Sequence, residues 1–343
     1  MKKILIIGIT GQDGSILATK FISENVKVVG TYRRGSDTGS DNKLWRLKDL
    51  QILNRVILEP LELNDPFSIQ KIIKKHKPQE IYHLAGSSFV QDSFDFPLYT
   101  IQTNVNSVIN ILESVKLINK SIKVFFASSS EIFDSDCSLI KNEKSKKSPR
   151  NPYGISKLTI LNLVDLYRKT YDMNLSTGIM FNHESPYRSR SYVTRKITFN
   201  LARIKFEGGK PMQLGNLNTS RDWGCAYDYT DAMKKIIKND LFEDFVISSG
   251  KLTSLRSIVL FAARQLDFNP KFVGKGLNEK CIDSKTGIKL IEVNKKYFRI
   301  HDTVGMVGDS SLLKSKIDWI PKNSIENTII EMVKKDLERI NKK

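Results

Sequence analysis

The chain has 343 residues, of which 40% are hydrophobic and 27% charged, a composition typical of a folded globular protein and not of a disordered one. This length suits a large domain with a smaller second lobe. No apolar run approaches the roughly 20 residues that a membrane-spanning helix needs, and the apolar stretch in the opening MKKILIIG is too short for a leader peptide. We therefore expect a cytoplasmic protein without membrane contact.

Basic residues outnumber acidic ones by 55 to 37, which gives a formal net charge of +18. Nucleic acid is the usual partner of such an excess, but no recognition module is visible, so we expect no nucleic-acid partner. We interpret the excess as lysine on a solvated surface, with a share facing anionic small molecules such as nucleotides. Cys137, Cys225 and Cys281 are widely spaced and lack CxxC or histidine partners, which supports neither a disulfide framework nor a metal site.

The first half of the chain alternates short β-rich runs with helical stretches. The expected strands are Lys3–Ile7, Lys27–Thr31, Arg55–Leu58, Glu80–His83, Lys123–Ala127 and Leu175–Phe181. The expected helices are 14–24, 66–76, 98–118 and 152–171. This alternation predicts an α/β fold with a doubly wound parallel sheet of the Rossmann type.

Beyond about residue 185 the pattern is less regular. A helix is expected at 192–207, a short strand after Pro211 and an amphipathic helix at about 325–340. The expected domains are a dinucleotide-binding domain over 1–185, to which segments at about 224–250 and 301–312 return, and a smaller, mixed and discontinuous substrate lobe over 186–343.

A glycine-rich stretch, GITGQDG, joins the first strand to the first helix through Gly8, Gly11 and Gly14. Glycines at this place allow a tight turn and let a pyrophosphate approach backbone N–H groups at the start of a helix. The second strand ends in Arg33 and Arg34, where NAD-preferring sheets usually have an acidic residue. Guanidinium groups suit a 2′-phosphate, so the sequence favours NADP over NAD.

Tyr153 and Lys157 in NPYGISK lie four residues apart in a predicted helix and therefore on one face of it. A lysine ammonium beside a phenol favours the phenolate, so we expect a lowered pKa for Tyr153. Such a tyrosine can take a proton from a sugar hydroxyl while a hydride leaves the same carbon. This YxxxK pair after a glycine-rich loop indicates an extended short-chain dehydrogenase/reductase.

A carboxylate, Glu131, follows the strand Lys123–Ala127, and Ser129 lies two residues before it. The carboxyl end of that strand faces the expected cofactor crevice. A dehydrogenase or epimerase needs a hydroxyl there but no carboxylate. Beside a sugar already oxidised at C4, however, a carboxylate can remove the acidified C5 proton so that the C6 hydroxyl leaves.

The chain resembles the GDP-mannose 4,6-dehydratase family along nearly its whole length. The matching stretches are GITGQDGS at 8–15, SSSEIF at 128–133, NPYGISK at 151–157, FNHESP at 181–186, VTRK at 193–196, LGNL at 214–217, RDWG at 221–224, and KKYFR at 295–299 followed by GD at 308–309. The resemblance implies that Ser129 binds the sugar O4, Glu131 is the C5 base, Tyr153 is the C4-hydroxyl base, and Lys157 is its partner.

The resemblance also implies the binding sets. Together with the loop glycines and the two arginines named above, it gives one set of expected cofactor-binding residues. This set is Gly8, Ile9, Thr10, Gly11, Gln12, Asp13, Gly14, Arg33, Arg34, Glu62, Leu63, Leu84, Ala85, Ser88, Tyr99, Lys157, His183 and Arg188. The expected GDP-sugar-binding residues are Ser88, Asn182, Val193, Lys196, Leu214, Gly215, Arg221 and Arg299. Family members are commonly dimers or tetramers, so a homo-oligomer is expected.

Some positions depart from the family pattern. They are the loop EIFDSD after the base, Glu62 near the adenine, Ser87 and Phe89 near the nicotinamide and sugar, Tyr187 and Ser189 in the loop that approaches a neighbouring subunit in the family, and Ile300. The expected reaction is conversion of GDP-mannose, or a close GDP-sugar, to the GDP-4-keto-6-deoxy sugar. The alternatives are a GDP-manno-heptose 4,6-dehydratase, or an epimerase or 4-reductase on the same scaffold.

Overall fold

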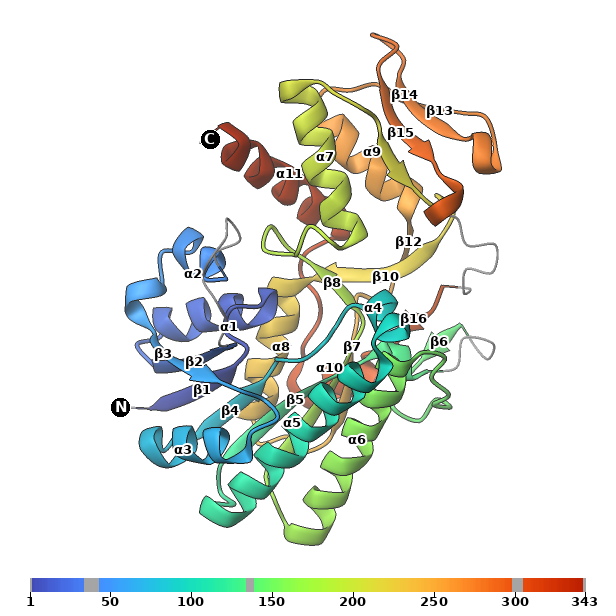
Figure 1. Cartoon of the computed structure of the whole chain (residues 1–343). Helices are drawn as coiled ribbons and strands as arrows, with labels where there is room; N and C mark the ends of the chain where they lie inside the picture. Colours follow the sequence, from blue (N-terminus) through green and yellow to red (C-terminus); the bar gives the residue numbers. More distant parts are fainter. Residues whose placement is uncertain (1, 34–42, 134–138, 298–304, 342–343) are drawn as a thin grey trace.

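The computed structural model describes residues 2–33, 43–133, 139–297 and 305–341. Its main sheet has seven parallel strands in the order β11-β7-β5-β4-β1-β2-β3 (Figure 1). These strands are β1 (Lys3–Ile7), β2 (Lys27–Arg33), β3 (Ile57–Leu61), β4 (Glu80–His83), β5 (Lys123–Ser129), β7 (Leu175–Met180) and β11 (Asp244–Ile247). The predicted doubly wound parallel sheet is confirmed, and β11 is a seventh strand beyond the six that were predicted.

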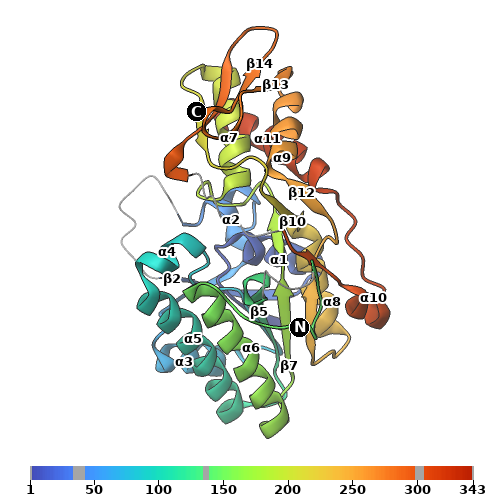
Figure 2. The same cartoon turned by 90° about the vertical axis from the view of Figure 1, so that its right-hand side faces the viewer.

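Helices cover both faces of this sheet (Figure 2). On one face lie α3 (Pro66–His76), α5 (Pro97–Ile118) and α6 (Pro152–Tyr171), and on the other lie α1 (Gln12–Ser23) and α8 (Ala226–Lys238). Three shorter helices are α2 (Trp45–Asp49), α4 (Val90–Asp95) and α10 (Ser311–Ile317). The helices α3, α5 and α6 each begin at a proline, which has no N–H to lose at the first helical position.

The third strand lies later in the chain than predicted. Residues Leu53–Arg55 form a 3₁₀ turn, and the strand runs through Pro60 to Leu61. Proline is tolerated there because β3 is an edge strand, where its missing N–H can face away from the ladder.

The second lobe packs three helices against a four-stranded sheet. The helices are α7 (Val193–Glu207), α9 (Leu255–Gln265) and α11 (Ile325–Asn341), and the strands are β9 (Met212–Leu214), β13 (Pro270–Val273), β14 (Lys280–Asp283) and β15 (Lys289–Val293). The predicted elements α7, β9 and α11 are confirmed. Their apolar side chains share one core with those of α9 and β15, separate from the cores of the main sheet.

A small three-stranded sheet connects the two parts: β8 (Asn182–Glu184), β10 (Ser220–Cys225) and β12 (Leu252–Ser254). A two-stranded pair, β6 (Ile140–Lys141) with β16 (Val307–Gly308), lies beside it. Because β8 follows directly after β7, it carries its side chains from the carboxyl edge of the main sheet toward the second lobe. None of the helices in the described ranges combines the length and hydrophobicity that crossing a bilayer requires.

Candidate active site

A cavity of about 1250 Å³ lies at the carboxyl edge of the main sheet. Its lining comes from the β1–α1 loop, the ends of β4, β5 and β7, the start of α6, β8 and the loop before α7. Strand order reverses between β1 and β4, and in doubly wound sheets ligands bind in the crevice at that point. The cavity exceeds the size usual for one small ligand.

The glycine-rich loop is shaped for close approach of a ligand backbone. Gly8 has φ +92°, a conformation that side chains disfavour, and a Cβ there would lie 2.9 Å from the Ala85 backbone nitrogen. A Cβ on Gly14 would lie 2.3 Å from the Gly8 carbonyl oxygen. This cradle at the start of α1 fits the pyrophosphate of a dinucleotide.

Asp13 and His183 join the phosphate loop to β8. The His183 Nε2 lies 3.0 Å from Asp13 Oδ2, and Nδ1 lies 2.8 Å from the Phe181 carbonyl oxygen. Burial by itself would lower the pKa of His183 and raise that of Asp13. The interaction between the two side chains is stronger than this effect, so the pKa of His183 is raised and the pKa of Asp13 is lowered. The pair holds two chain-distant parts of the crevice together.

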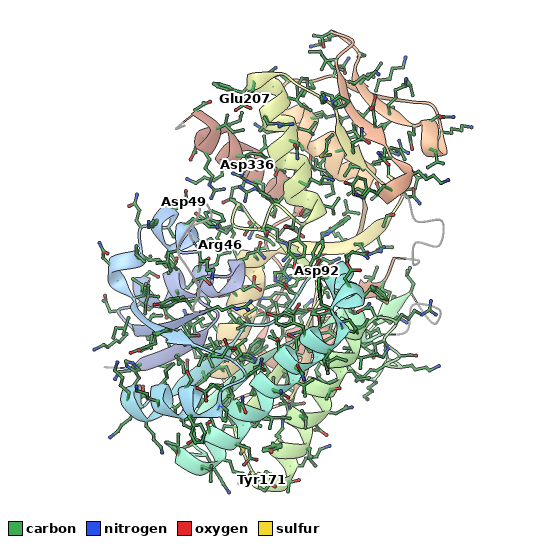
Figure 3. The ribbon with its side chains drawn as sticks, in the orientation of Figure 1. Arg46, Asp49, Asp92, Tyr171, Glu207 and Asp336 are labelled. Atoms are coloured by element: carbon green, nitrogen blue, oxygen red, sulfur yellow. The ribbon has the colours of Figure 1, made fainter. Side chains whose placement is uncertain are left out.

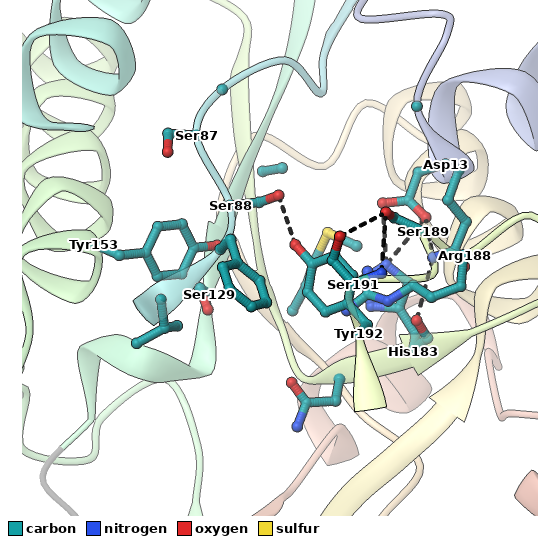
Figure 4. A pocket seen from close by; sticks show the side chains of 18 of the residues that line it. Asp13, Ser87, Ser88, Ser129, Tyr153, His183, Arg188, Ser189, Ser191 and Tyr192 are labelled. Carbon is teal, nitrogen blue, oxygen red and sulfur yellow. Dashed lines mark hydrogen bonds and ion pairs between the residues drawn. The ribbon is translucent and has the colours of Figure 1, made fainter. Parts of the chain in front are cut away.

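Tyr192 crosses the middle of the cavity between the two lobes (Figure 4). Its hydroxyl is 2.8 Å from Ser88 Oγ, and its ring lies 3.5 Å from the Arg188 guanidinium carbon. Arg188 also forms an ion pair with Glu184 at 3.3 Å. The structure thus brings Ser88 and Arg188 together through a tyrosine that sequence reasoning did not select.

The first two turns of α6 present Tyr153 and Lys157 to the cavity, as their spacing predicted. Lys157 Nζ donates to the Ala127 carbonyl oxygen at 2.8 Å and lies 5.7 Å from the Tyr153 ring centre. Burial lowers the pKa of Lys157 to about 8.

The expectation of a lowered pKa for Tyr153 is wrong in this structure. Burial raises the pKa of the Tyr153 phenol, and a hydrogen bond with Ser129 only partly opposes this. The phenol is buried, so the cost of desolvating a phenolate outweighs the effect of nearby groups.

Glu131 lies in a short 3₁₀ turn, Ser130–Ile132, at the end of β5. Its backbone N–H donates to Ser129 Oγ at 3.3 Å, and its Oε2 accepts from Asn151 Nδ2 at 2.8 Å. The residue lines the same cavity as Ser129, Tyr153 and Lys157. The four predicted catalytic residues are therefore brought together, with the carboxylate side chain at the cavity wall.

The opposite end of the cavity is bordered by Arg33, Glu62, Leu63 and Tyr99. Arg33 Nη1 donates to the Tyr99 hydroxyl at 3.0 Å, and the guanidinium carbon lies 5.9 Å from the Tyr99 ring centre. A cation beside an aromatic ring at the end of β2 suits a phosphorylated ribose and its base.

Most of the other predicted binding residues also line the cavity. They are Thr10, Gly11, Gln12, Leu84, Ala85, Asn182, Val193, Lys196, Leu214, Gly215 and Arg221. Ile9 lies behind the loop with its side chain in the core. Arg34 and Arg299 lie outside the described residues, as do Cys137 and Ile300.

Sequence reasoning missed several lining residues: Arg46, Asn216, Lys296 and Tyr297. Arg46 donates to the Thr10 carbonyl oxygen at 2.9 Å and to the Tyr187 carbonyl oxygen at 2.6 Å, which braces the phosphate loop. No local pattern signals this role, because Arg46 lies on the short helix α2, far along the chain from both partners.

This fold and site define an extended short-chain dehydrogenase/reductase, a class for which a nicotinamide cofactor is typical. Two solved structures are similar over almost the whole chain. RMD from Pseudomonas aeruginosa, complexed with NADPH, has a TM-score of 0.77 at 19% identity and covers 99% of this chain and 100% of its own. The dTDP-glucose 4,6-dehydratase of Bacillus anthracis, in complex with NAD, has a TM-score of 0.78 at 20% identity, covering 99% and 98%.

Sequence comparison narrows the class to one family. The sequence model described as GDP-mannose 4,6 dehydratase matches residues 5–332. The human GDP-mannose 4,6 dehydratase is 37% identical over 339 residues, covering 97% of this chain and 91% of the human protein. The Drosophila melanogaster protein of that name is 35% identical over 345 residues, covering 99% and 87%. The chain belongs to the GDP-mannose 4,6-dehydratase family, as its motifs predicted.

Proposed function

We propose that this chain is a GDP-sugar 4,6-dehydratase, a hydro-lyase that converts GDP-mannose, or a close GDP-sugar, to the GDP-4-keto-6-deoxy sugar and water. The observation that supports this is the carboxylate of Glu131 in the same cavity as Ser129, Tyr153 and Lys157. An epimerase or reductase uses the hydroxyl, the tyrosine and the lysine but has no step for that carboxylate.

Each side chain has a distinct role in this proposal. Tyr153 takes the proton from the C4 hydroxyl, Ser129 donates a hydrogen bond to O4, and Lys157 holds the nicotinamide ribose. Glu131 removes the C5 proton once C4 is a ketone, and its carboxyl then protonates the C6 oxygen that leaves as water. The nicotinamide, when bound, would accept the hydride from C4 and return it to C6. C5 then regains a proton, which balances the one that Tyr153 took from the C4 hydroxyl, so no net oxidation occurs.

We propose NADP as the cofactor. The glycine cradle with the backbone of Asp13, together with His183 and Arg188, would hold the pyrophosphate end, and Arg33 with Arg34 is proposed to bind the 2′-phosphate. The similar RMD structure contains NADPH. The GDP-sugar would lie against Asn182, Val193, Lys196, Leu214, Gly215 and Arg221, and Arg299 is proposed to complete this clamp.

The first test asks whether water is lost. Purified protein is incubated with GDP-mannose and a catalytic amount of NADP, and the nucleotide sugars are analysed by mass spectrometry. Loss of one water mass without net cofactor reduction is expected. An epimerase would give a product of unchanged mass, and a 4-reductase would consume reduced cofactor.

The second test is Glu131→Gln, which keeps the size of the side chain and removes the base. Because a positioned acid or base contributes about 10²–10⁴ in rate, turnover should fall by about that factor while C4 oxidation continues. The measurement is product mass together with deuterium exchange at C4. Dehydration at the wild-type rate would show that Glu131 is not the base.

Two classes of sugar, a hexose and a heptose, are the candidates for the substrate. Ser87 and Phe89, which depart from the family pattern, line the cavity near Tyr192, and the Phe89 and Tyr192 rings lie 5.5 Å apart edge to face. Because these departures lie near the sugar, we propose a GDP-manno-heptose as the alternative substrate. Comparing kcat/KM across a panel of GDP-hexoses and GDP-heptoses distinguishes the two.

We further propose that the protein is a homodimer or homotetramer. Large apolar side chains are exposed on neighbouring helices: Phe96 and Leu98 at 63% and 67% at the start of α5, and Ile155 and Leu166 at 47% and 54% on α6. Exposed apolar surface of this kind suits an interface between copies. Light scattering coupled to size-exclusion chromatography should give the mass of two or four chains.

A further inference from the structure

Asn151 connects the helix that carries Tyr153 to the carboxylate of Glu131. It is the N-cap residue of α6, with φ −145°, and its Oδ1 accepts from the Gly154 N–H at 2.7 Å. The other end of the same amide, Nδ2, donates to Glu131 Oε2 at 2.8 Å. One side chain therefore satisfies a free N–H of the helix and holds the carboxylate.

The chemistry of the two partners allows only one orientation of this amide. A backbone N–H can only donate, so it must face Oδ1, and an ionised carboxylate can only accept, so it must face Nδ2. Asn151 is 8% exposed, and the following Pro152 restricts the backbone at the first position of the helix. The donor that faces Glu131 is thus held in place by the capping geometry itself.

The backbone of Glu131 is held by the same turn of α6. A Cβ built on Gly154 would lie 2.4 Å from the Glu131 carbonyl oxygen, so the glycine permits direct contact between the 3₁₀ turn and the helix. Both the main chain and the carboxylate of Glu131 therefore rest on the turn that also carries Tyr153.

Asn151 contacts Glu131 but does not line the main cavity. Asn151 borders a small recess of about 70 Å³ that Glu131 also lines, whereas the main cavity is lined by Glu131 but not by Asn151. The hydrogen bond from Asn151 engages Oε2 of the carboxylate.

We propose that Asn151 is a positioning residue for the base. Its amide fixes the Glu131 carboxylate relative to α6 and therefore relative to Tyr153. A sugar whose C4 hydroxyl lies at Tyr153 then has its C5 proton within reach of Glu131. This inference rests on the proposed dehydratase function. It predicts a selective loss of the C5 and C6 steps when the amide donor is removed, with C4 oxidation retained.

Two substitutions remove the donor and place at position 151 a residue that is favoured as an N-cap. Asn151→Asp keeps an oxygen for the Gly154 N–H, since aspartate and asparagine cap equally well, but it places a second carboxylate against Glu131. Asn151→Gly removes the donor without adding charge, and glycine also caps well. The control is Asp65→Asn, a matching exchange at the N-cap of α3, where the side chain accepts from the Phe67 N–H at 3.0 Å.

Three readouts are taken with GDP-mannose and NADP: kcat and KM for water loss, solvent deuterium incorporation at C5, and single-turnover absorbance of reduced nicotinamide as a report of C4 oxidation. Because a positioned base contributes about 10²–10⁴ in rate, we expect both Asn151 variants to lose about 10- to 100-fold in kcat and in C5 exchange. KM and the C4 step should change by less than about threefold, and Asp65→Asn should match the wild type.

Two results would overturn the inference. One is water loss by Asn151→Asp and Asn151→Gly within about twofold of the wild type, which would make Asn151 a cap only. The other is equal loss of the C4 and C5 steps in both variants, which would show a general loss of the folded site. If the wild-type protein itself loses no water from any GDP-sugar, the proposed function fails instead, before any variant is compared.

Discussion

Lys157 is a buried cation, and its charge has opposite consequences for stability and for activity. The side chain is 8% exposed, and burial lowers its pKa from 10.5 to about 8. The unfolded chain therefore binds this proton more tightly than the folded chain does. The charged lysine costs stability below about pH 8, and the cost disappears as the pH rises to about 10.5.

We predict that Lys157→Met stabilises the protein at pH 7 by about 1–3 kcal/mol while it abolishes turnover. The variant removes the desolvation cost of the ammonium, although it also loses the hydrogen bond to the Ala127 carbonyl oxygen. Denaturant unfolding at pH 7 and at pH 10.5 measures the effect. The gain should shrink at the higher pH, and a gain that grows with pH would contradict this account.

Arg33 provides a residue-scale test of cofactor choice. Its guanidinium reaches the Tyr99 hydroxyl at the edge of the cavity, where the end of β2 would meet the ribose. We predict that Arg33→Ala weakens NADP binding by about tenfold and leaves NAD binding within about twofold, because a hydrogen-bonded ion pair with phosphate is worth about 1.5–3 kcal/mol.

Fluorescence titration of each dinucleotide gives the two dissociation constants. Arg55→Ala, on the 3₁₀ turn before β3, is the matched control and should leave their ratio unchanged. Equal weakening of NADP and NAD by Arg33→Ala would indicate a contact that does not involve the 2′-phosphate.

At the scale of elements, α6 contacts the turn Ser130–Ile132 at Gly154. This contact reverses the effect on stability that replacing a helical glycine by alanine usually has. Replacing an exposed helical glycine by alanine normally stabilises a protein by about 1 kcal/mol. At Gly154, however, the new Cβ would meet the Glu131 carbonyl oxygen at 2.4 Å, and the neighbouring atom is backbone.

We therefore predict that Gly154→Ala is destabilising by about 1–3 kcal/mol and lowers turnover, because the turn that carries Glu131 must move away from α6. Thermal unfolding and the rate of water loss give the two results. Asn162→Ala, at an exposed position of the same helix, should be neutral or slightly stabilising. A stabilised and fully active Gly154→Ala would show that the turn adapts without cost.

At the scale of the whole molecule, a buried ion pair joins the second lobe to the site. Arg195 on α7 donates to Asp336 on α11 through Nε and Nη2 at 2.9 and 2.5 Å, and Asp336 is fully buried. The same guanidinium donates to the Pro186 carbonyl oxygen at 2.5 Å and to that of Arg188 at 3.0 Å. Asp336 lies on α11 above the end of the main sheet (Figure 3), so the C-terminal helix supports the loop that carries Arg188.

We predict that Asp336→Ala destabilises the protein by about 3–5 kcal/mol, because the buried Arg195 charge loses its carboxylate and keeps only neutral carbonyl partners. It should also weaken cofactor binding, since the Arg188 loop loses its support. Glu338→Ala, on the surface of the same helix, is the control and should change stability by less than about 1 kcal/mol. The measurements are the unfolding midpoint and the NADP affinity of each variant. Equal effects of Asp336→Ala and Glu338→Ala would contradict the role proposed for the buried ion pair.

The features that could be predicted from the sequence are those that depend on local interactions. The strand–glycine loop–helix unit at Gly8–Gly14, the pairing of Tyr153 with Lys157 on one helix face, and the position of Glu131 at the end of a buried strand each depend on residues within about one turn or one loop. The amphipathic pattern at about 325–340 also predicted α11, because its apolar face repeats at the helical spacing.

The contacts between distant segments and the effects of burial could not be predicted, because they depend on how the elements pack. His183 meets Asp13 across 170 residues, and Arg195 meets Asp336 across 141, and no local pattern records such pairings. The raised pKa of Tyr153 likewise depends on how much water the fold excludes, which a neighbouring lysine in the sequence does not reveal. Local propensity selects the elements, but the packing of those elements against one another sets the solvation and the partners of each catalytic group.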